Sequence, residues 1–330
     1  MPFIIQNNFV LLHETIKIMR KVIGIGETVL DIIFRDEQPI SALPGGSTFN
    51  AIISLGRAGV RTGFISETGN DRVGRLITGF LEKNGCPASS VCVYPDSKSP
   101  LSLAFLNEHN DADYVFYKDH PNDRLDFVYP DVQPDDIVLF GSYYALNPVI
   151  RGQVKSFLDD AHERGAILYY DVNFRASHQN EVVRLRANLL ENFELADIVR
   201  GSSEDFEVLF RKTDASSIYR SEIMFYTHKF IYTHAAEPIE LFSDGGFHKQ
   251  YPVAPIDTVS TIGAGDNFNA GLLFGLIRDG ITHEQLELGL TEQQWDRLIS
   301  SGQQFSAEVC GSLQNYVSPA FGEARRQELG

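Results

Sequence analysis

Short apolar runs alternate with longer amphipathic segments along most of this chain, and that alternation narrows the folds open to it. Near-continuous apolar runs predict strands that are buried on both faces. Strand–helix–strand repetition predicts the α/β class, with a mostly parallel sheet covered by helices on both faces. The predicted strands are residues 22–25, 63–65, 137–140, 167–170, 198–199 and 230–232, and the predicted helices are residues 48–58, 72–84, 148–164, 181–193, 204–211, 219–227 and 267–278.

Three segments depart from this alternation. Residues 31–34 form an extra apolar run, and residues 102–106 and 114–117 flank a turn-like stretch. These segments predict a small antiparallel sheet outside the main one. Residues 240–242 and the run that begins at Phe247 predict a second hairpin around Asp244 and two glycines.

Composition restricts the class of partner. The chain has 330 residues, which fits one large α/β domain or two modest ones, and its formal net charge is −16. So acidic a surface disfavours nucleic acid and anionic membranes as partners. No apolar stretch reaches the roughly 20 residues of a membrane helix. Cys86, Cys92 and Cys310 form no spaced motif, and a reducing cytoplasm fits them.

The first 18 residues do not fit the pattern of the rest. Two short apolar stretches there are separated by Gln6, Asn7 and Asn8, and no basic residue precedes them, so a signal peptide is disfavoured. We expect residues 1–18 to be an extension, either disordered or upstream of a functional start at Met19. Residues 19–330 are then expected to form the folded domain.

One loop combines flexibility with a carboxylate at the start of an apolar helix. Gly263, Ala264 and Gly265 precede Asp266, which opens the last long helix that we predict. Glycines let backbone N–H groups converge on an anion, and a helix N-terminus adds its positive dipole end. Asp266 would then be a proton acceptor beside a bound phosphate. An ordinary N-cap is the alternative interpretation of the same residue.

Further polar clusters are predicted at the ends of other strands. Asp31 follows the first strand, Gly45 and Gly46 open a helix that carries Asn50, and Arg175 ends the stretch 171–175 after a central strand. In an open parallel sheet, ligands collect beyond the carboxyl ends of the strands, so these clusters can share one cleft. The chain has no P-loop, no complete dinucleotide fingerprint and no zinc spacing.

In order and spacing, these elements resemble the PfkB (ribokinase-like) family of carbohydrate kinases from about residue 20 onward. The matching elements are Asp31; Gly45-Gly46-x-x-x-Asn50; Asp171-x-Asn173-x-Arg175; and Gly263-Ala264-Gly265-Asp266. The stretches 99–105, 116–118 and 171–175 are most similar to fructokinase-like members. The resemblance implies a ribokinase-like three-layer α/β/α sandwich with a β-lid, here near residues 31–43 and 99–120.

The resemblance also implies roles for the residues that match. Asp266 resembles the catalytic base, and the backbone of Gly263, Ala264 and Gly265 resembles the anion hole for the transferring phosphoryl group. Asp31, Gly45, Gly46, Asn50 and Arg175 correspond to the sugar-binding positions. ATP and Mg²⁺ are the implied cofactors, the partner is a small-molecule sugar, and the lid implies a homodimer.

The chain departs from the family pattern in three places. Ser260, Thr261 and Ile262 separate the glycines from an Asp-Thr pair, which disfavours the monovalent-cation site that some members build there. Ser202 and Asp205 replace the usual Asn and Glu. Because Asp is shorter than Glu, Mg²⁺ is expected to be reached through water or through Glu204, and Asp205 and Glu204 are the candidate metal residues. Residues 233–237 lack the usual glycines. Ser202 and Asn315 are the candidates for contact with the nucleotide.

The predicted function is phosphorylation of a sugar hydroxyl by ATP, with fructose or a related ketose as the acceptor. A kinase of 2-keto-3-deoxygluconate, or of another sugar or nucleoside, is the alternative within the family. An acidic pocket at Asp31 disfavours a phosphorylated sugar. A sugar-binding protein without catalytic activity is a second alternative, which the departures at Ser202 and Asp205 support and the intact loop before Asp266 opposes.

Overall fold

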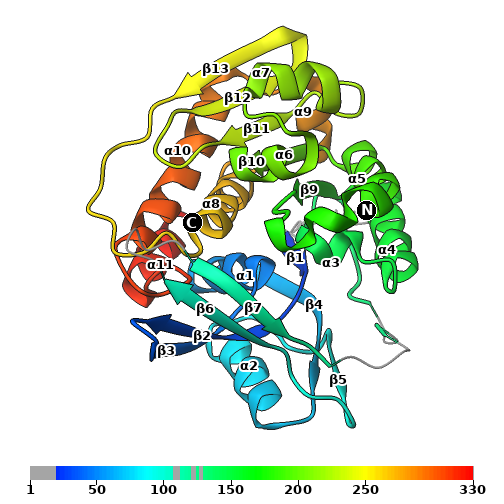
Figure 1. The fold of residues 1–330 in the computed structure, drawn as a ribbon. Coiled ribbons are helices and arrows are strands. Elements are labelled where there is room, and N and C mark those ends of the chain that lie inside the picture. Colours follow the sequence, from blue (N-terminus) through cyan, green and yellow to red (C-terminus); the bar gives the residue numbers. More distant parts are fainter. Residues whose placement is uncertain (1–19, 107–111, 120–123, 126–128, 330) are drawn as a thin grey trace, which may run out of the picture.

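A nine-stranded sheet forms the centre of the molecule (Figure 1). The computed structural model describes residues 20–106, 112–119, 124–125 and 129–329. In spatial order the strands are β13 (Phe247–Tyr251), β12 (Ile239–Ser243), β11 (Phe230–Thr233), β10 (Ile198–Ser202), β9 (Ile167–Asp171), β8 (Ile137–Gly141), β1 (Lys21–Ile25), β4 (Arg61–Gly69) and β5 (Val91–Tyr94). All neighbours from β11 to β5 are parallel, and β12 and β13 add an antiparallel edge.

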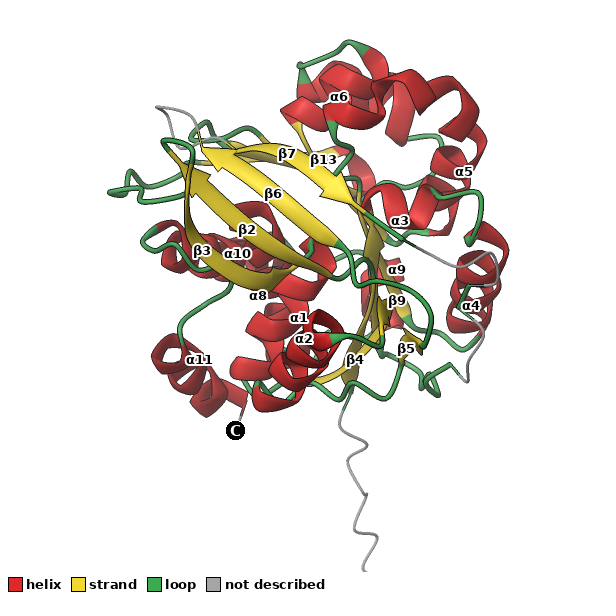
Figure 2. Cartoon of the chain, turned by 60° about the horizontal axis from the view of Figure 1, so that its bottom comes forward, coloured by secondary structure: helices red, strands yellow, loops and turns green. Residues whose placement is uncertain are grey.

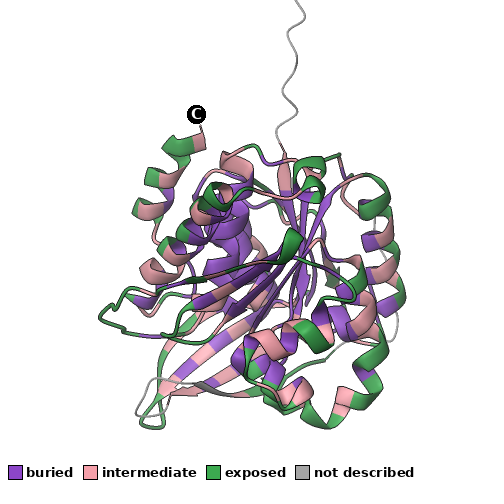
Figure 3. Ribbon diagram, turned by 90° about the horizontal axis from the view of Figure 1, so that it is seen from above, coloured by how far each residue is buried: buried purple, intermediate pink, exposed green. Residues whose placement is uncertain are grey.

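Helices cover both faces of this sheet, because successive strand residues point to opposite sides. In β8, Leu139 packs into one apolar cluster and Phe140 into the other. The central strands β8 and β9 are therefore buried along their length (Figure 3), whereas the edge strands β5 and β13 are partly exposed. The first face packs on α1 (Ser47–Arg57), α2 (Arg72–Lys83), α8 (Ala264–Arg278), α9 (His283–Leu288), α10 (Glu292–Cys310) and α11 (Pro319–Arg326), and the second packs on α3 (Ser142–Leu146), α4 (Arg151–Glu163), α5 (Val182–Leu195), α6 (Ser203–Phe210) and α7 (Ala215–Ile218).

A second sheet of four strands lies apart from the main sheet and forms the lid (Figure 2). Its order is β3 (Gln38–Gly45), β2 (Val29–Arg35), β6 (Leu101–Leu106) and β7 (Ala112–Tyr117). The predicted small sheet is confirmed, but its predicted antiparallel character is only partly right, because β2 and β6 run parallel. Within the lid segment 99–120, residues 107–111 and 120 lie outside the described residues, as does the expected extension 1–18.

The predicted alternation of strands and helices is confirmed, with three differences. Helix α8 begins at Ala264, three residues before the predicted start, so Asp266 lies in its first turn and is not the N-cap. It is also not the last long helix, since α10 follows it. The predicted helix 219–227 lies four residues further toward the N-terminus: its helical turns run from Ala215 to Ile223.

None of the helices in the described ranges is both long and apolar enough to cross a membrane. The three cysteines are free thiols, and Cys86 and Cys310 are buried.

Candidate active site

A cleft between the lid and the main sheet brings six of the thirteen predicted site residues together. Its walls come from the lid strands β2 and β7, the start of α1, the loop after β9 and the start of α8. The predicted residues that line it are Asp31, Gly46, Asn50, Arg175, Gly263 and Asp266. The predicted residues that do not line it are Gly45, Ser202, Glu204, Asp205, Ala264, Gly265 and Asn315.

The first turn of α8 has no side-chain cap among the described residues, although the amide of Ala264 donates to the carbonyl oxygen of Thr261 at 3.1 Å. Gly263 is the N-cap with φ 79°. Two features favour glycine at position 263. Its φ is positive, and a Cβ there would lie 2.7 Å from the carbonyl oxygen of Asn315. Uncapped N–H groups at a helix start carry partial positive charge, which suits an anion. The anion hole at Gly263, Ala264 and Gly265 remains a prediction.

Asp266 is a buried carboxylate at the floor of the cleft. Its Oδ2 accepts a hydrogen bond of 2.8 Å from Nδ2 of Asn50. Burial raises the pKa of Asp266 to about 7, while the Asn50 hydrogen bond and the charges of Arg175 and Arg200 oppose the shift and the charge of Asp171 adds to it. A carboxylate with a pKa near neutrality is a better proton acceptor than an ordinary one. The sequence analysis did not anticipate this shift.

Asp31 is a second buried carboxylate in the same cleft. Nδ2 of Asn315 donates to Oδ2 of Asp31 over 3.2 Å, and Asp31 is only 7% exposed. Burial raises its pKa to about 7, and the charge of Arg175 partly opposes the shift. The structure therefore places the side chain of Asn315 against Asp31, and contact of Asn315 with a nucleotide remains a prediction.

The two glycines before α1 have a reason that sequence reasoning missed. A Cβ on Gly45 would lie 2.0 Å from Oδ2 of Asp31, and one on Gly46 would lie 2.2 Å from the carbonyl oxygen of Glu27. Because these residues have no side chains, Gly45 can pack against the carboxylate of Asp31 and Gly46 against the backbone of Glu27, between β1 and β2. Contact with sugar hydroxyls remains a prediction for both.

Arg175 and the lid form the opposite wall. Arg175 is exposed, its guanidinium lies 5.8 Å from the centre of the Tyr114 ring, and it forms no ion pair with any residue that the structure describes. Lys118 of the lid bonds to Glu27 at 2.5 Å, and both line the cleft. A charged bridge therefore already spans the lid and the floor.

The residues predicted to reach Mg²⁺ have a different arrangement. Ser202 and Asp205 form a capping box at the start of α6, in which Oδ2 of Asp205 accepts from the Ser202 amide at 2.6 Å. Oδ1 accepts from the Phe174 amide at 2.7 Å. Both oxygens of Asp205 are thus engaged, and Glu204 beside it is exposed. A Ser followed three residues later by an acid is a common helix start, which the sequence could have indicated.

No group of three or more His, Cys, Asp or Glu side chains within the described ranges is arranged to hold a metal ion. Mg²⁺ in proteins commonly keeps several waters and uses few protein carboxylates, and the predicted Mg²⁺ site remains a prediction. Glu204 is the described acid at the start of α6 best placed to contribute, and it lies near enough to Arg175 for their charges to interact. Its role remains a prediction.

Sequence reasoning also missed residues that line or support the cleft. Tyr143 stacks on His178 with ring centres 3.9 Å apart, and both line the cleft. His178 contacts Glu181 at 3.0 Å. Arg200 lies buried beneath the first turn of α8, within 3.0 Å of where a Cβ on Gly265 would be. A lone His or Arg carries no spacing signal, so only the fold could assign them to the site.

Comparison with known proteins places the chain among sugar kinases. The family described as pfkB family carbohydrate kinase matches residues 19–313. Probable fructokinase-3 of Arabidopsis thaliana is 23% identical over 78% of this chain and 78% of its own length. A 5-dehydro-2-deoxygluconokinase of Geobacillus kaustophilus is 27% identical over 74% of this chain and 76% of its own.

Solved structures share the fold. The fructokinase of Vibrio cholerae O395, in a form with fructose, ADP and calcium bound, superposes with a TM-score of 0.80 at 20% identity and covers 93% of this chain and 98% of that one. Aminoimidazole riboside kinase of Salmonella enterica gives 0.76 at 21% identity, with 94% and 100% covered. The ribokinase-like α/β fold predicted from the sequence is confirmed.

Proposed function

The chain belongs to the pfkB family of carbohydrate kinases, phosphotransferases that act on a sugar, and on that premise we propose that it transfers the γ-phosphoryl group of ATP to a hydroxyl of a free ketose such as fructose. One observation carries this proposal. Asp266, with its pKa raised to about 7, faces the same cleft as Asp31 and Asn50 and stands in the uncapped first turn of α8.

On the sugar side, Asp31 and Asn50 hold the acceptor. The Asp31 carboxylate accepts hydrogen bonds from sugar hydroxyls, and the Asn50 amide fixes the orientation of Asp266. Asp266 takes the proton of the attacking hydroxyl as the new oxygen–phosphorus bond forms. General-base assistance of this kind contributes about 10²–10⁴-fold to a rate.

On the phosphate side, the backbone N–H groups of the first turn of α8 face the charge that develops on the phosphoryl oxygens. Preorganised donors of this kind are often the largest single contribution to catalysis. Divalent metal, proposed here to be Mg²⁺, neutralises phosphate charge when bound with the nucleotide. The lid residues Tyr114 and Phe116 line the cleft and keep water from competing with the sugar hydroxyl.

Two features support a neutral ketose. Fructokinases recur among the relatives. Within the cleft, Glu27, Asp31 and Asp266 supply negative charge, and Lys118 is already bonded to Glu27. A phosphorylated sugar would need several free cations, which these described residues do not provide.

A keto acid is the second candidate, and Arg175 supports it. This guanidinium lines the cleft without an ion pair to any described residue. An arginine fork matches a carboxylate in a bidentate manner. The similarity to a 5-dehydro-2-deoxygluconokinase agrees with an acidic acceptor.

A coupled assay of ATP consumption separates these candidates. The panel contains fructose, other free hexoses and pentoses, a nucleoside, fructose 6-phosphate, 2-keto-3-deoxygluconate and 5-dehydro-2-deoxygluconate, each with Mg²⁺. We expect the highest kcat/KM with fructose. Preference for a keto acid that is lost in Arg175→Met would favour the second candidate, and sugar binding without turnover on any compound would indicate a protein without catalytic activity.

A homodimer through the lid is proposed as well. Tyr114 and Phe116 face the cleft, so Val115 and Tyr117 between and beyond them face outward, where they are 42% and 58% exposed. An outward apolar lid face suits a second copy. Sedimentation of the wild type against Val115→Glu tests this, and a wild-type monomer at micromolar concentration contradicts it.

A further inference from the structure

A buried arginine, Arg200, lies in the middle of the main sheet, where a parallel strand normally carries apolar side chains. It belongs to β10 and is 7% exposed. Its neighbours Ile198 and Val199 are fully buried apolar residues. A buried charge persists only when its surroundings compensate it, so the partners of Arg200 indicate its purpose.

Those partners come from the strands on either side. Nη1 of Arg200 contacts Oδ1 of Asp171 at 3.0 Å, and Asp171 ends β9 directly opposite. Nη2 donates to Oγ1 of Thr233 at 2.7 Å, at the end of β11. The guanidinium of Arg200, in β10, thus contacts the ends of β9 and β11. Its Nε is buried without a hydrogen-bond partner among the described residues.

The first turn of α8 rests directly on this guanidinium. A Cβ on Gly265 would lie 3.0 Å from Nη2 and 3.2 Å from Nη1. Gly265 lies inside the helix and has an ordinary backbone conformation, so the turn itself does not require glycine there. A methyl group at Gly265 would therefore require the guanidinium of Arg200 to shift by a few tenths of an ångström.

We propose that Arg200 is a positioning residue for phosphoryl transfer, whose guanidinium supports the first turn of α8 from the sheet side and holds Gly265 and Asp266 where they face the transferring group. This inference rests on the proposed function of the cleft. Arg200 does not line the cleft, so it acts through the turn and not by touching substrate.

The electrostatics point the same way. Around Asp266 lie Asn50 as hydrogen-bond donor, the cations Arg175 and Arg200, the anion Asp171 and the phenol of Tyr114. The charges of Arg175 and Arg200 each lower the pKa of Asp266. Loss of the Arg200 charge therefore raises the pKa of Asp266, and the fraction able to accept a proton falls at neutral pH.

The test is a double-mutant cycle between Arg200→Met and Gly265→Ala, with Arg200→Lys as the conservative variant. We expect Arg200→Met to lower kcat about 10- to 100-fold, as displaced catalytic geometry does, with little change in the KM for sugar. The acidic limb of the pH–kcat/KM profile should move to higher pH. Arg200→Lys should recover part of both effects.

Gly265→Ala sharpens the test, because alanine suits a helix better than glycine does. In the wild-type background the new methyl group meets the guanidinium, and we expect kcat to fall. In the Arg200→Met background the same substitution should cost less, since the obstacle is gone. Additive effects in the cycle would overturn the proposal.

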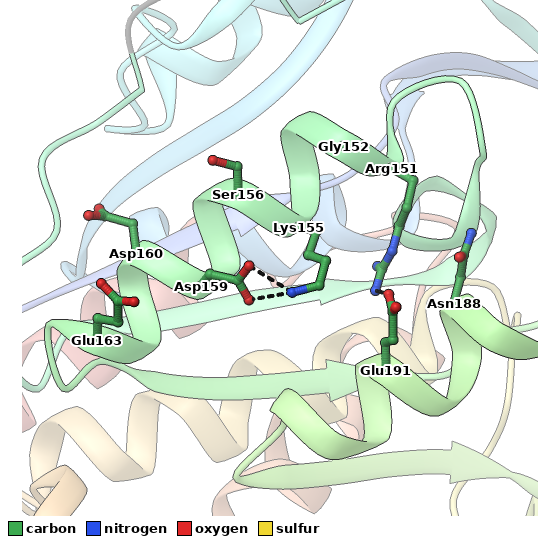
Figure 4. Close-up of a pocket in the computed structure, with 9 residues that line it drawn as sticks. All are labelled: Arg151, Gly152, Lys155, Ser156, Asp159, Asp160, Glu163, Asn188 and Glu191. Atoms are coloured by element: carbon green, nitrogen blue, oxygen red, sulfur yellow. Dashed lines mark hydrogen bonds and ion pairs between the residues drawn. The ribbon is translucent and has the colours of Figure 1, made fainter.

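Arg151→Met is the matched control, since Arg151 is a buried arginine of α4 that pairs with Glu191 at 2.8 Å (Figure 4). Arg151 also donates to the carbonyl oxygen of Ala145 in α3 and does not line the cleft, so its loss should lower the melting temperature with little effect on kcat or the pH profile. The same outcome for Arg200→Met would reduce Arg200 to a structural residue. Should Arg200→Met alone fail to fold, Arg200→Met/Asp171→Asn removes both charges and keeps the comparison.

Affinity for a nonhydrolysable ATP analogue, measured by calorimetry, keeps the two hypotheses apart. If the wild type turns over no sugar, the proposed function fails, and weaker analogue binding by Arg200→Met than by Arg151→Met would still support the role of Arg200. If the wild type is active and both variants match it in turnover and binding, only the role of Arg200 fails.

Discussion

Two regions of this molecule gather charged side chains, and they do so in opposite ways. In the hollow between α4 and α5, Lys155 pairs with Asp159 and Arg151 with Glu191, from two helices that run side by side (Figure 4). In the cleft, Asn50 and Asp266 meet across 216 positions of sequence. Charges in the hollow neutralise one another at the surface, whereas the cleft buries two carboxylates whose pKa values rise to about 7.

The comparison shows that a cluster of charged side chains is not by itself a sign of a catalytic site. An exposed pair between neighbouring turns needs only helical spacing and contributes little. A buried carboxylate is costly and persists where the fold requires its chemistry. Substitutions in the two regions should therefore differ most in their effect on turnover.

The largest contrast is expected at Asp266. Asp266→Asn keeps an oxygen to accept from Asn50 but cannot accept the hydroxyl proton, so kcat should fall by roughly 10²–10⁴-fold. Asp159→Asn in the hollow is the control and should leave kcat unchanged. Steady-state kinetics measures both, and near-full activity of Asp266→Asn would exclude it as the base.

The next effect concerns the sugar. Asp31→Ala removes the carboxylate that Asn315 orients, and hydrogen bonds to a charged group are worth about 1.5–3 kcal/mol. We expect the KM for sugar to rise by one to two orders of magnitude, roughly, since 1.4 kcal/mol is tenfold. The KM for ATP should change far less. An unchanged sugar KM would place the sugar elsewhere.

The next effect is the pH dependence of kcat/KM, which should report the protonation of Asp266. With a pKa of about 7, Asp266 is increasingly protonated as pH falls below neutrality. kcat/KM should therefore decrease from pH 8 to pH 5, approaching tenfold per unit, roughly, on the acidic limb. A profile that is flat over this range would contradict the raised pKa.

A smaller effect is expected on stability. Asp266 has a folded pKa of about 7 against an ordinary value of 3.8, so the native state binds more protons between these values and loses stability as pH rises through 7. Asp266→Asn removes that loss, and the free energy of unfolding at pH 8 should rise by about 1–3 kcal/mol over wild type. The gain should vanish near pH 4. Equal gains at both pH values would point to another cause.

The smallest effect belongs to the hollow. Lys155→Met breaks a pair whose side chains are 40% and 41% exposed. The free energy of unfolding should change by less than about 0.5 kcal/mol, and less still in high salt. Chemical denaturation measures this change. A larger decrease in the free energy of unfolding would contradict the view that the exposed pairs of the hollow contribute little to stability.

The sequence predicted the parts of the cleft that spacing can encode. Asp266 after its two glycines and Asn50 after its own pair were both identified. The contact of Asn315 with Asp31 was not predicted, because nothing in the sequence connects the two positions. Arg200 was overlooked, since one basic residue in an apolar run forms no motif. Burial sets the pKa of Asp31 and Asp266, and burial is a property of the whole fold.

The hydrogen bond from Asn315 to Asp31 joins positions 284 residues apart. Nearby, Arg57 donates to the carbonyl oxygen of Val317 at 2.6 Å, which fixes the same late segment to α1. During synthesis the early part of a chain folds first, and long-range contacts close slowly. The surroundings of Asp31 are therefore complete only after residues 315–317 have been synthesised. A nascent chain that stalls earlier lacks these contacts.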